Sequence, residues 1–237
     1  MISEGHVSVD GVTLTSPAFK VGSGADIRVH GSRIPDLTAP RLWRYHKPKG
    51  LLTSTRDPQG RGTVFDHLPE DMPRVMTIGR LDLNSEGLLL LTNDGEIKRY
   101  LELPSTGWRR RYRARVYGRL KEGDLARLTK GIRCDGELLK AEEVTLERSS
   151  GENYWLVFVL TEGRNREIRR MVEAIGGQVN KLIRTSYGPF QLGSLKTGEV
   201  EEVNRKVLRE QLGSLLAAPR KEKPRSTPKK TDADRRR

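Results

Sequence analysis

The stretch that decides the fold is GRLDLNSEGLLLLTNDG, residues 79 to 95. It sets one carboxylate, Asp82, in a polar turn directly ahead of the apolar run Leu88 to Leu91. A short apolar run bounded by turn residues is typical of a buried strand. Asp94 follows that run and can cap a helix extending to about Leu103. The stretch therefore predicts a turn, a buried strand and a helix in immediate succession.

The turn around Asp82 first suggests a calcium loop. The sequence DLNSEG places side-chain oxygens at the first, third and fifth positions and a glycine at the sixth, as an EF-hand does. The twelfth position of such a loop needs a bidentate glutamate, and here it is Asn93. The flanks are also strand-like, so calcium is excluded. Asp82 is then either an ordinary turn residue, which bonds nearby backbone groups, or a catalytic group.

The composition points to a polyanionic partner. The chain has 237 residues, and 44 lysines and arginines against 31 acidic residues give a net charge of +13. A charge of this size and sign suits binding to nucleic acid.

Several other classes of protein are excluded. Cys134 is the one cysteine, so the chain can form neither an intrachain disulfide nor a thiolate zinc cluster. The four histidines show no paired ligand spacing. No apolar run approaches the roughly 20 residues of a membrane span, and the first residues lack a secretory pattern. We therefore expect a cytoplasmic, metal-free protein that needs no cofactor and does not contact a membrane.

Composition divides the chain into four parts, at residues 1–35, 36–40, 41–213 and 214–237. The first predicts short strands joined by Asp-Gly and His-Gly turns, and the second is a proline-containing linker. From Pro219 onward the last part holds no aromatic residue and no aliphatic one larger than alanine. It is expected to be a disordered basic tail, serving either as a solubilising extension or as an arm for RNA phosphates.

The main body, residues 41–213, predicts strands with a few interspersed helices. The helices are expected at 95–103, 122–128, 166–175 and 205–213, between strands such as LWRYHK and YWLVFVL. They do not alternate regularly with the strands. This pattern indicates an α+β fold with a mixed, largely antiparallel central sheet flanked by helices.

Two arginine-rich segments predict nucleic-acid contacts. In WRRRYRARVYG, residues 108–118, a strand would put Tyr112 on one face with Arg110, and Arg111 and Arg113 on the other. An aromatic ring beside arginines can stack on a base while the cations hold phosphates. In EGRNREIRRM, residues 162–171, three arginines have i, i+3, i+4 spacing and are expected on one helix face. They are Arg166, Arg169 and Arg170.

These motifs together resemble a known enzyme family. GRLDLNSEGLLLLTNDG is similar to the catalytic motif of pseudouridine synthases that act on small-subunit and large-subunit ribosomal RNA. HKPKG at 46–50, the arginine-rich strand, the EGRNREIRRM helix and LIRTSYGPFQLGSL resemble further motifs of that family, in the same order. Residues 1–35 resemble the second half of an S4-type RNA-binding module. The resemblance implies the pseudouridine-synthase fold over about 41–213.

The resemblance also implies a reaction and a set of residues. Uridine would be isomerised to pseudouridine with Asp82 as nucleophile, Tyr112 stacked on the uracil and Arg169 beside the carboxylate. Residues expected to contact RNA are Lys47, Lys49, Arg80, Arg109, Arg110, Arg111, Arg113, Arg166 and Arg170. The partner would be ribosomal RNA or a ribosomal precursor particle, bound by a monomer. The wording of the motifs is most similar to the large-subunit, 23S branch.

Other functions remain open at this point. A non-catalytic RNA-binding or ribosome-assembly factor would explain the charge, and the same enzyme could act on 16S rRNA. A nuclease would need clustered carboxylates for metal ions, and Asp82 with Glu86 alone is a weak match.

Overall fold

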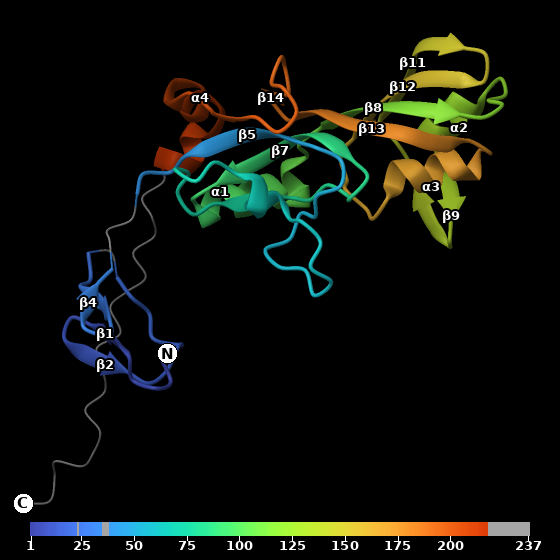
Figure 1. The fold of residues 1–237 in the computed structure, drawn as a ribbon. Coiled ribbons are helices and arrows are strands. Elements are labelled where there is room, and N and C mark those ends of the chain that lie inside the picture. The colour runs from blue at the N-terminus through green and yellow to red at the C-terminus, as the bar shows by residue number, and fades with distance from the viewer. Residues whose placement is uncertain (23, 35–37, 218–237) are drawn as a thin grey trace, which may run out of the picture. The chain divides into compact units, whose positions relative to one another are not determined.

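The computed structural model describes residues 1–22, 24–34 and 38–217 (Figure 1). The chain divides into two compact units, which we treat separately. One contains Met1–Ala39 and the described residues from Leu212 onward, and the other is Pro40–Gln211. Residues 35–37 of the linker region and 218–237 of the predicted tail lie outside the described residues, so the expectations for them stay predictions.

The first unit contains a four-stranded antiparallel sheet in the order β2-β1-β3-β4. Its strands are β1 Val7–Val9, β2 Val12–Leu14, β3 Ile27–Val29 and β4 Ser32–Arg33. The two hairpin turns, Asp10-Gly11 and His30-Gly31, have positive φ at both residues. That conformation matches the twist of the flanking strands and favours glycine at the second position. Both predicted turns are therefore present, whereas the S4-like character of this segment remains a prediction.

The second unit is built on a nine-stranded sheet. Its main path runs β11-β12-β8-β13-β7-β5-β15, and β14 and β6 pair at the side with β13 and β7. The strands are β5 Leu42–Lys47, β6 Met76–Ile78, β7 Glu86–Thr92, β8 Arg110–Tyr117, β11 Glu143–Ser150, β12 Asn153–Leu160, β13 Gln178–Tyr187, β14 Phe190–Gln191 and β15 Val200–Glu202. Of the strand pairs in this described sheet, β13 and β7 alone run parallel. The predicted mixed, largely antiparallel sheet is confirmed.

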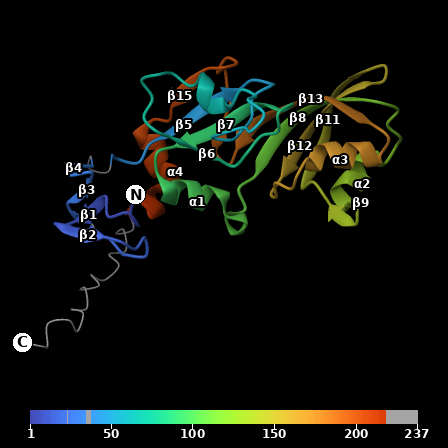
Figure 2. The ribbon, with the colours of Figure 1, turned by 60° about the horizontal axis from the view of Figure 1, so that its bottom comes forward.

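Helices and a small hairpin flank this sheet. They are α1 Gly95–Glu102, α2 Asp124–Lys130 and α3 Glu167–Ala174, with the hairpin strands β9 Ile132–Cys134 and β10 Glu137–Leu139. The helix α4 Arg205–Ala217 follows β15 in the chain and includes residues of both units. Short 3-10 turns lie at Val64–His67 and Pro104–Thr106. The helix α1 packs on β6 and β7, α2 on β11, and α3 on β13 and β9 (Figure 2). The observed α2 starts two residues later than expected, and α4 continues past residue 213 with a kink at Leu212.

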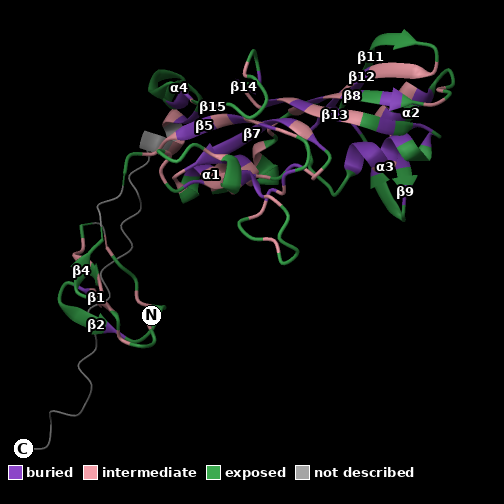
Figure 3. Cartoon of the chain, in the orientation of Figure 1, coloured by how far each residue is buried: buried purple, intermediate pink, exposed green. Residues whose placement is uncertain are grey.

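The stretch that opened the sequence analysis forms the centre of the sheet. All seven residues of β7 except Glu86 are buried, because neighbouring strands and α1 enclose it (Figure 3). At its end, Asp94 accepts hydrogen bonds from the backbone N–H groups of Glu96 and Ile97, at 2.8 and 3.0 Å. The predicted strand and capped helix are both confirmed.

The parallel pair β7–β13 joins two halves of the sheet, and we call it the junction. Its register pairs Ile183 with Glu86 and Arg184 with Gly87. Gly87 has φ +101°, and a Cβ there would lie 2.3 Å from the backbone oxygen of Arg184. The two backbones can approach this closely because Gly87 has no side chain.

Candidate active site

The turn carrying Asp82 lies immediately before β7, at the junction. The N–H of Ser85 donates to the carbonyl of Asp82 at 3.0 Å and closes the turn. Thr53 Oγ1 donates to the carbonyl of Leu81 at 2.9 Å, and the N–H of Gly50 donates to the carbonyl of Leu83 at 2.8 Å. The turn is thus fixed from both ends, and Asp82 itself is half-buried.

Lys47 lies beneath this turn rather than on the surface. Its Nζ is buried and donates to the carbonyl oxygens of Pro48, Asp82 and Ser85, at 2.9, 3.2 and 3.0 Å. An ammonium has three N–H donors, so all of them are used. Burial lowers the pKa of Lys47 to about 8, although the nearby charges of Asp82 and Glu86 act in the opposite direction. The predicted phosphate contact therefore does not match this position, because no donor faces solvent.

Arg169 connects α3 to the same turn. Its Nη1 donates to the carbonyl of Val179 and its Nη2 to the carbonyl of Asn84, both at 2.9 Å. Its side chain is buried, and burial lowers its pKa while the charge of Asp82 raises it. The charges of Arg169 and Asp82 therefore act on each other, whereas the hydrogen bonds of Arg169 go to backbone carbonyls, one of them in the Asp82 turn.

Arg184, which the sequence analysis did not single out, is a third buried cation at the junction. Its Nε donates to the carbonyl of Leu88 at 2.7 Å, and its guanidinium lies over the ring of Tyr187, 5.3 Å from the centroid. It is near enough to Lys47 to lower the pKa of that lysine further. A sequence signal exists, because Arg184 occupies an inward position of β13 between the buried Leu182 and Ser186.

Tyr112 lies on β8, two strands from the turn. It is buried on the same face as Ala114, as the alternation predicted, and pairs in register with Arg184, which pairs in turn with Gly87. Adjacent strands are about 4.8 Å apart, so Tyr112 is roughly 10 Å from Gly87. The structure therefore brings Tyr112, Arg169 and Asp82 to the region around the junction.

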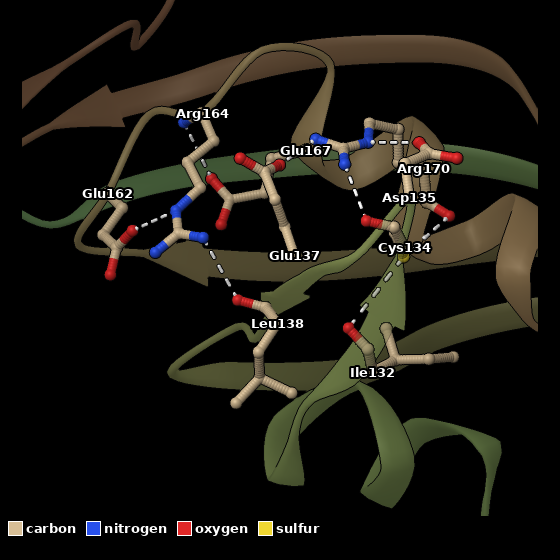
Figure 4. A network of polar contacts seen from close by, with 9 residues as sticks. All are labelled: Ile132, Cys134, Asp135, Glu137, Leu138, Glu162, Arg164, Glu167 and Arg170. Atoms are coloured by element: carbon tan, nitrogen blue, oxygen red, sulfur yellow. Dashed lines mark hydrogen bonds and ion pairs between the residues drawn. The ribbon is translucent and has the colours of Figure 1, made fainter.

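The expected face of three arginines on α3 is wrong. Arg166 has φ 47° and stands just before the helix, whereas Arg169 is buried. Arg170 instead donates to Asp135 and Glu137 of the β9–β10 hairpin, at 3.2 and 2.7 Å (Figure 4). The spacing assumed a helix that includes Arg166, but α3 begins at Glu167, and the left-handed backbone of Arg166 removes that residue from the helical face.

The other residues expected to contact RNA are distributed more widely. Lys49, Arg80, Arg109, Arg111 and Arg166 are exposed. Arg109 forms an ion pair with Glu142, and Arg113 with Glu147. Arg110 stacks on Tyr187 and donates to its hydroxyl at 2.9 Å. Arg80 is two residues before Asp82, and Lys49 precedes Gly50, whose N–H donates to the carbonyl of Leu83 in the turn. These two are therefore the better candidates for phosphate contacts near Asp82.

This arrangement supports covalent chemistry by a carboxylate. Within the described residues no group of acidic, histidine or cysteine side chains could hold a metal ion. The half-buried carboxylate of Asp82 stands on a fixed turn, where the charges of Lys47 and Arg169 act on it. A carboxylate held this way can act as a nucleophile and later as a leaving group.

Comparison with known proteins defines the class. A family model described as RNA pseudouridylate synthase matches residues 41–174. The chain is 47% identical over 211 residues to an uncharacterized RNA pseudouridine synthase of Rickettsia felis, covering 88% of this chain and 90% of that protein. The chain therefore belongs to the RNA pseudouridylate synthase family and is an enzyme of that class, which confirms the resemblance seen in its motifs.

Two further relatives refine this placement. Ribosomal large subunit pseudouridine synthase B of Pasteurella multocida is 43% identical over 223 residues, covering 90% of this chain and 65% of that protein. A crystal structure of a pseudouridylate synthase superposes with a TM-score of 0.66 at 24% identity, covering 88% of this chain and 89% of that one. The fold is therefore that of pseudouridylate synthases. No helix among the described residues is long and apolar enough to cross a membrane.

Proposed function

We propose that this enzyme isomerises uridine in ribosomal RNA of the large subunit, with Asp82 as the nucleophile. The observation that carries the proposal is the mounting of Asp82 on a turn held by Lys47 and Arg169. The name of the Pasteurella relative supports the choice of large-subunit RNA.

The reaction exchanges one bond to the ribose for another. The N1–C1′ bond breaks, the uracil turns, and a C5–C1′ bond forms while C5 loses its proton and N1 gains one. Asp82 bonds covalently to the nucleotide and leaves again, so it keeps one of the two separated parts attached to the enzyme until the C5–C1′ bond forms. The cations around the turn stabilise its charge after the base has displaced water.

Binding presents the uridine to this carboxylate. The target base must leave its stack, at a cost of a few kcal/mol. Tyr112, on the strand two away from the turn, stacks on the extruded uracil. Lys49 and Arg80 contact the flanking phosphates, since both are exposed and adjoin the turn.

The central test is Asp82→Asn. This variant should fold and bind 23S rRNA fragments as the wild type does, but it should release no tritium from uridine labelled at C5. Retained turnover would exclude Asp82 as the nucleophile. A pseudouridine map of both rRNAs from cells with and without the protein tests the substrate, since a site lost from 16S rRNA would contradict the proposed branch.

A further inference from the structure

The outward face of β8 and its neighbours carries cations that the catalytic site does not use. Tyr112, Ala114 and Val116 point to the core under α3, whereas Arg111 and Arg115 point the other way and are exposed. Figure 3 shows exposed and half-buried positions along β8, β11 and β12. Strand register places a larger set of residues on this outward side. We use the name open face for six of them: Arg111, Arg113, Arg115, Arg148, Trp155 and Ile183.

Trp155 organises part of the open face. The guanidinium of Arg113 lies 4.7 Å and that of Arg148 5.6 Å from the centroid of its ring. Trp155, which is only half-buried, restricts both side chains before any partner arrives. Restricting long side chains in advance lowers the entropy cost of binding.

The charge of the open face is positive and largely unpaired. Arg113 pairs with Glu147, and the adjoining Lys181 with Glu86. Within the described chain, Arg111, Arg115 and Arg148 form no ion pair with a carboxylate. Strand pairing places one further carboxylate of the described residues on this side. It is Glu143 of β11, which pairs with Val159 of β12, and Val159 pairs in turn with Arg111.

The spacing of these cations suits a polyanion. Alternate residues of a strand are about 6.6–6.8 Å apart, so Arg111, Arg113 and Arg115 form an evenly spaced row. Neighbouring phosphates of a nucleic-acid strand have a comparable separation. An acidic protein offers carboxylates at no such fixed interval, so the row favours RNA.

We infer that the open face is a second RNA-binding surface, which holds a segment of the substrate RNA away from the target uridine. This inference rests on the proposed function for its choice of partner. It assigns Arg111 and Arg113 to this surface rather than to the catalytic side, because they lie on the face opposite Tyr112.

The experiment compares two triple variants of the full chain. The first variant replaces the three open-face arginines that form no ion pair, with the substitutions Arg111→Gln, Arg115→Gln and Arg148→Gln. The matched control loses the same number of positive charges at exposed positions outside the open face, with the substitutions Lys121→Gln, Arg133→Gln and Lys140→Gln. Circular dichroism and thermal unfolding establish that both variants fold. Affinity for a long 23S fragment and for a short stem-loop containing the target uridine is then measured over a range of salt concentrations.

The affinity of the open-face variant for the long fragment should be lower by a factor of about 10 or more. The slope of log affinity against log salt concentration should be smaller in magnitude by about 2–3. Its affinity for the stem-loop and its saturated turnover should match the wild type. An equal loss in the control would overturn the inference, as would unchanged affinity for the long fragment. Unchanged affinity would leave an acidic protein as the occupant of this face. If the wild-type protein bound RNA but did not isomerise uridine, the proposed function would be contradicted. The inference that the open face binds RNA would not be affected.

Discussion

The buried cations at the junction and the exposed cations of the open face have different partners, although their side chains are of the same types. Lys47, Arg169 and Arg184 all donate to backbone carbonyls. On the open face, Arg113 donates to a carboxylate and rests on Trp155, and Arg111 is exposed. A buried cation finds its hydrogen-bond acceptors only within the protein, so its bonds fix the backbone, whereas an exposed one remains available for phosphate. Burial therefore separates the cations that hold the backbone from the cations that we propose to bind RNA.

The largest expected effect is a loss of stability when a side chain is introduced at Gly87, where the backbones of β7 and β13 approach closely. In Gly87→Ala the new methyl group would meet the backbone oxygen and nitrogen of Arg184 at 2.3 and 2.7 Å. We expect destabilisation on the order of 4 kcal/mol or more, or failure to fold, measured by urea unfolding. Gly95→Ala is the control, because no atom lies within 4 Å of its Cβ and its stability should change little. Equal stability of the two variants would contradict the close approach of β7 and β13.

Removing Arg169 should separate turnover from binding. Arg169→Ala leaves the carbonyl groups of Asn84 and Val179 without their donor and releases the turn. Loss of positioning should reduce turnover on the order of 100-fold, with RNA affinity within about 3-fold of the wild type. Arg166→Ala, an exposed change in the same motif, is the comparison and should affect affinity more than turnover. Parallel losses of both quantities in Arg169→Ala would indicate a phosphate contact instead.

Deprotonation of Lys47 should reduce the turnover of the enzyme at alkaline pH. The pKa of Lys47 is lowered from 10.5 to about 8, mainly by burial, so above pH 8 the amine lacks a donor for one of its three carbonyl partners. We expect wild-type turnover to fall above this pH. Lys47→Met should lower turnover about 10-fold at pH 7 and remove that limb of the profile.

The contribution of Lys47 to folding stability should change with pH in the opposite direction to turnover. The lowered pKa means that the unfolded chain holds this proton more tightly between pH 8 and 10.5, so the contribution of Lys47 to stability rises with pH there. An alkaline loss of turnover accompanied by unfolding would therefore contradict the positioning role.

The smallest effect concerns Glu167, a buried acid at the start of α3. Burial raises its pKa above the ordinary 4.5, and the N–H of Arg164 donates to it at 3.2 Å. The folded state then binds its proton more tightly, so stability decreases as pH rises past 4.5. Glu167→Gln should raise the melting temperature on the order of 2 °C at pH 7, and the gain should vanish below pH 4.5. A gain that persists in acid would show that charge is not its cause.

Local patterns predicted much of the fold. The turn, the strand LLLLT, the helix cap at Asp94 and the alternation along β8 all follow from short-range periodicity and side-chain chemistry. Asp82 was singled out in the same way, by its place between a polar turn and a buried strand. Its role as nucleophile and the stacking role of Tyr112 remain predictions.

The positions of Lys47, Arg170 and Arg184 depended on contacts that a local pattern does not contain. Lys47 is buried because β5 pairs with β7 and sets it against the Asp82 turn, far along the chain. Arg170 faces the β9–β10 hairpin rather than solvent for a similar reason. Whether a lysine or arginine meets phosphate or backbone is thus decided by tertiary packing, which the residue type alone does not reveal.

The junction has a consequence for how the enzyme assembles. Asp82 comes from one half of the sheet, and Tyr112 and Arg169 come from the half joined to it through β13. Nearly 100 residues separate the paired Gly87 and Arg184, so this contact closes a long loop and is expected to form late in folding. During synthesis the turn would remain without its partners until β13 has left the ribosome, so a truncated chain would carry Asp82 but no working site.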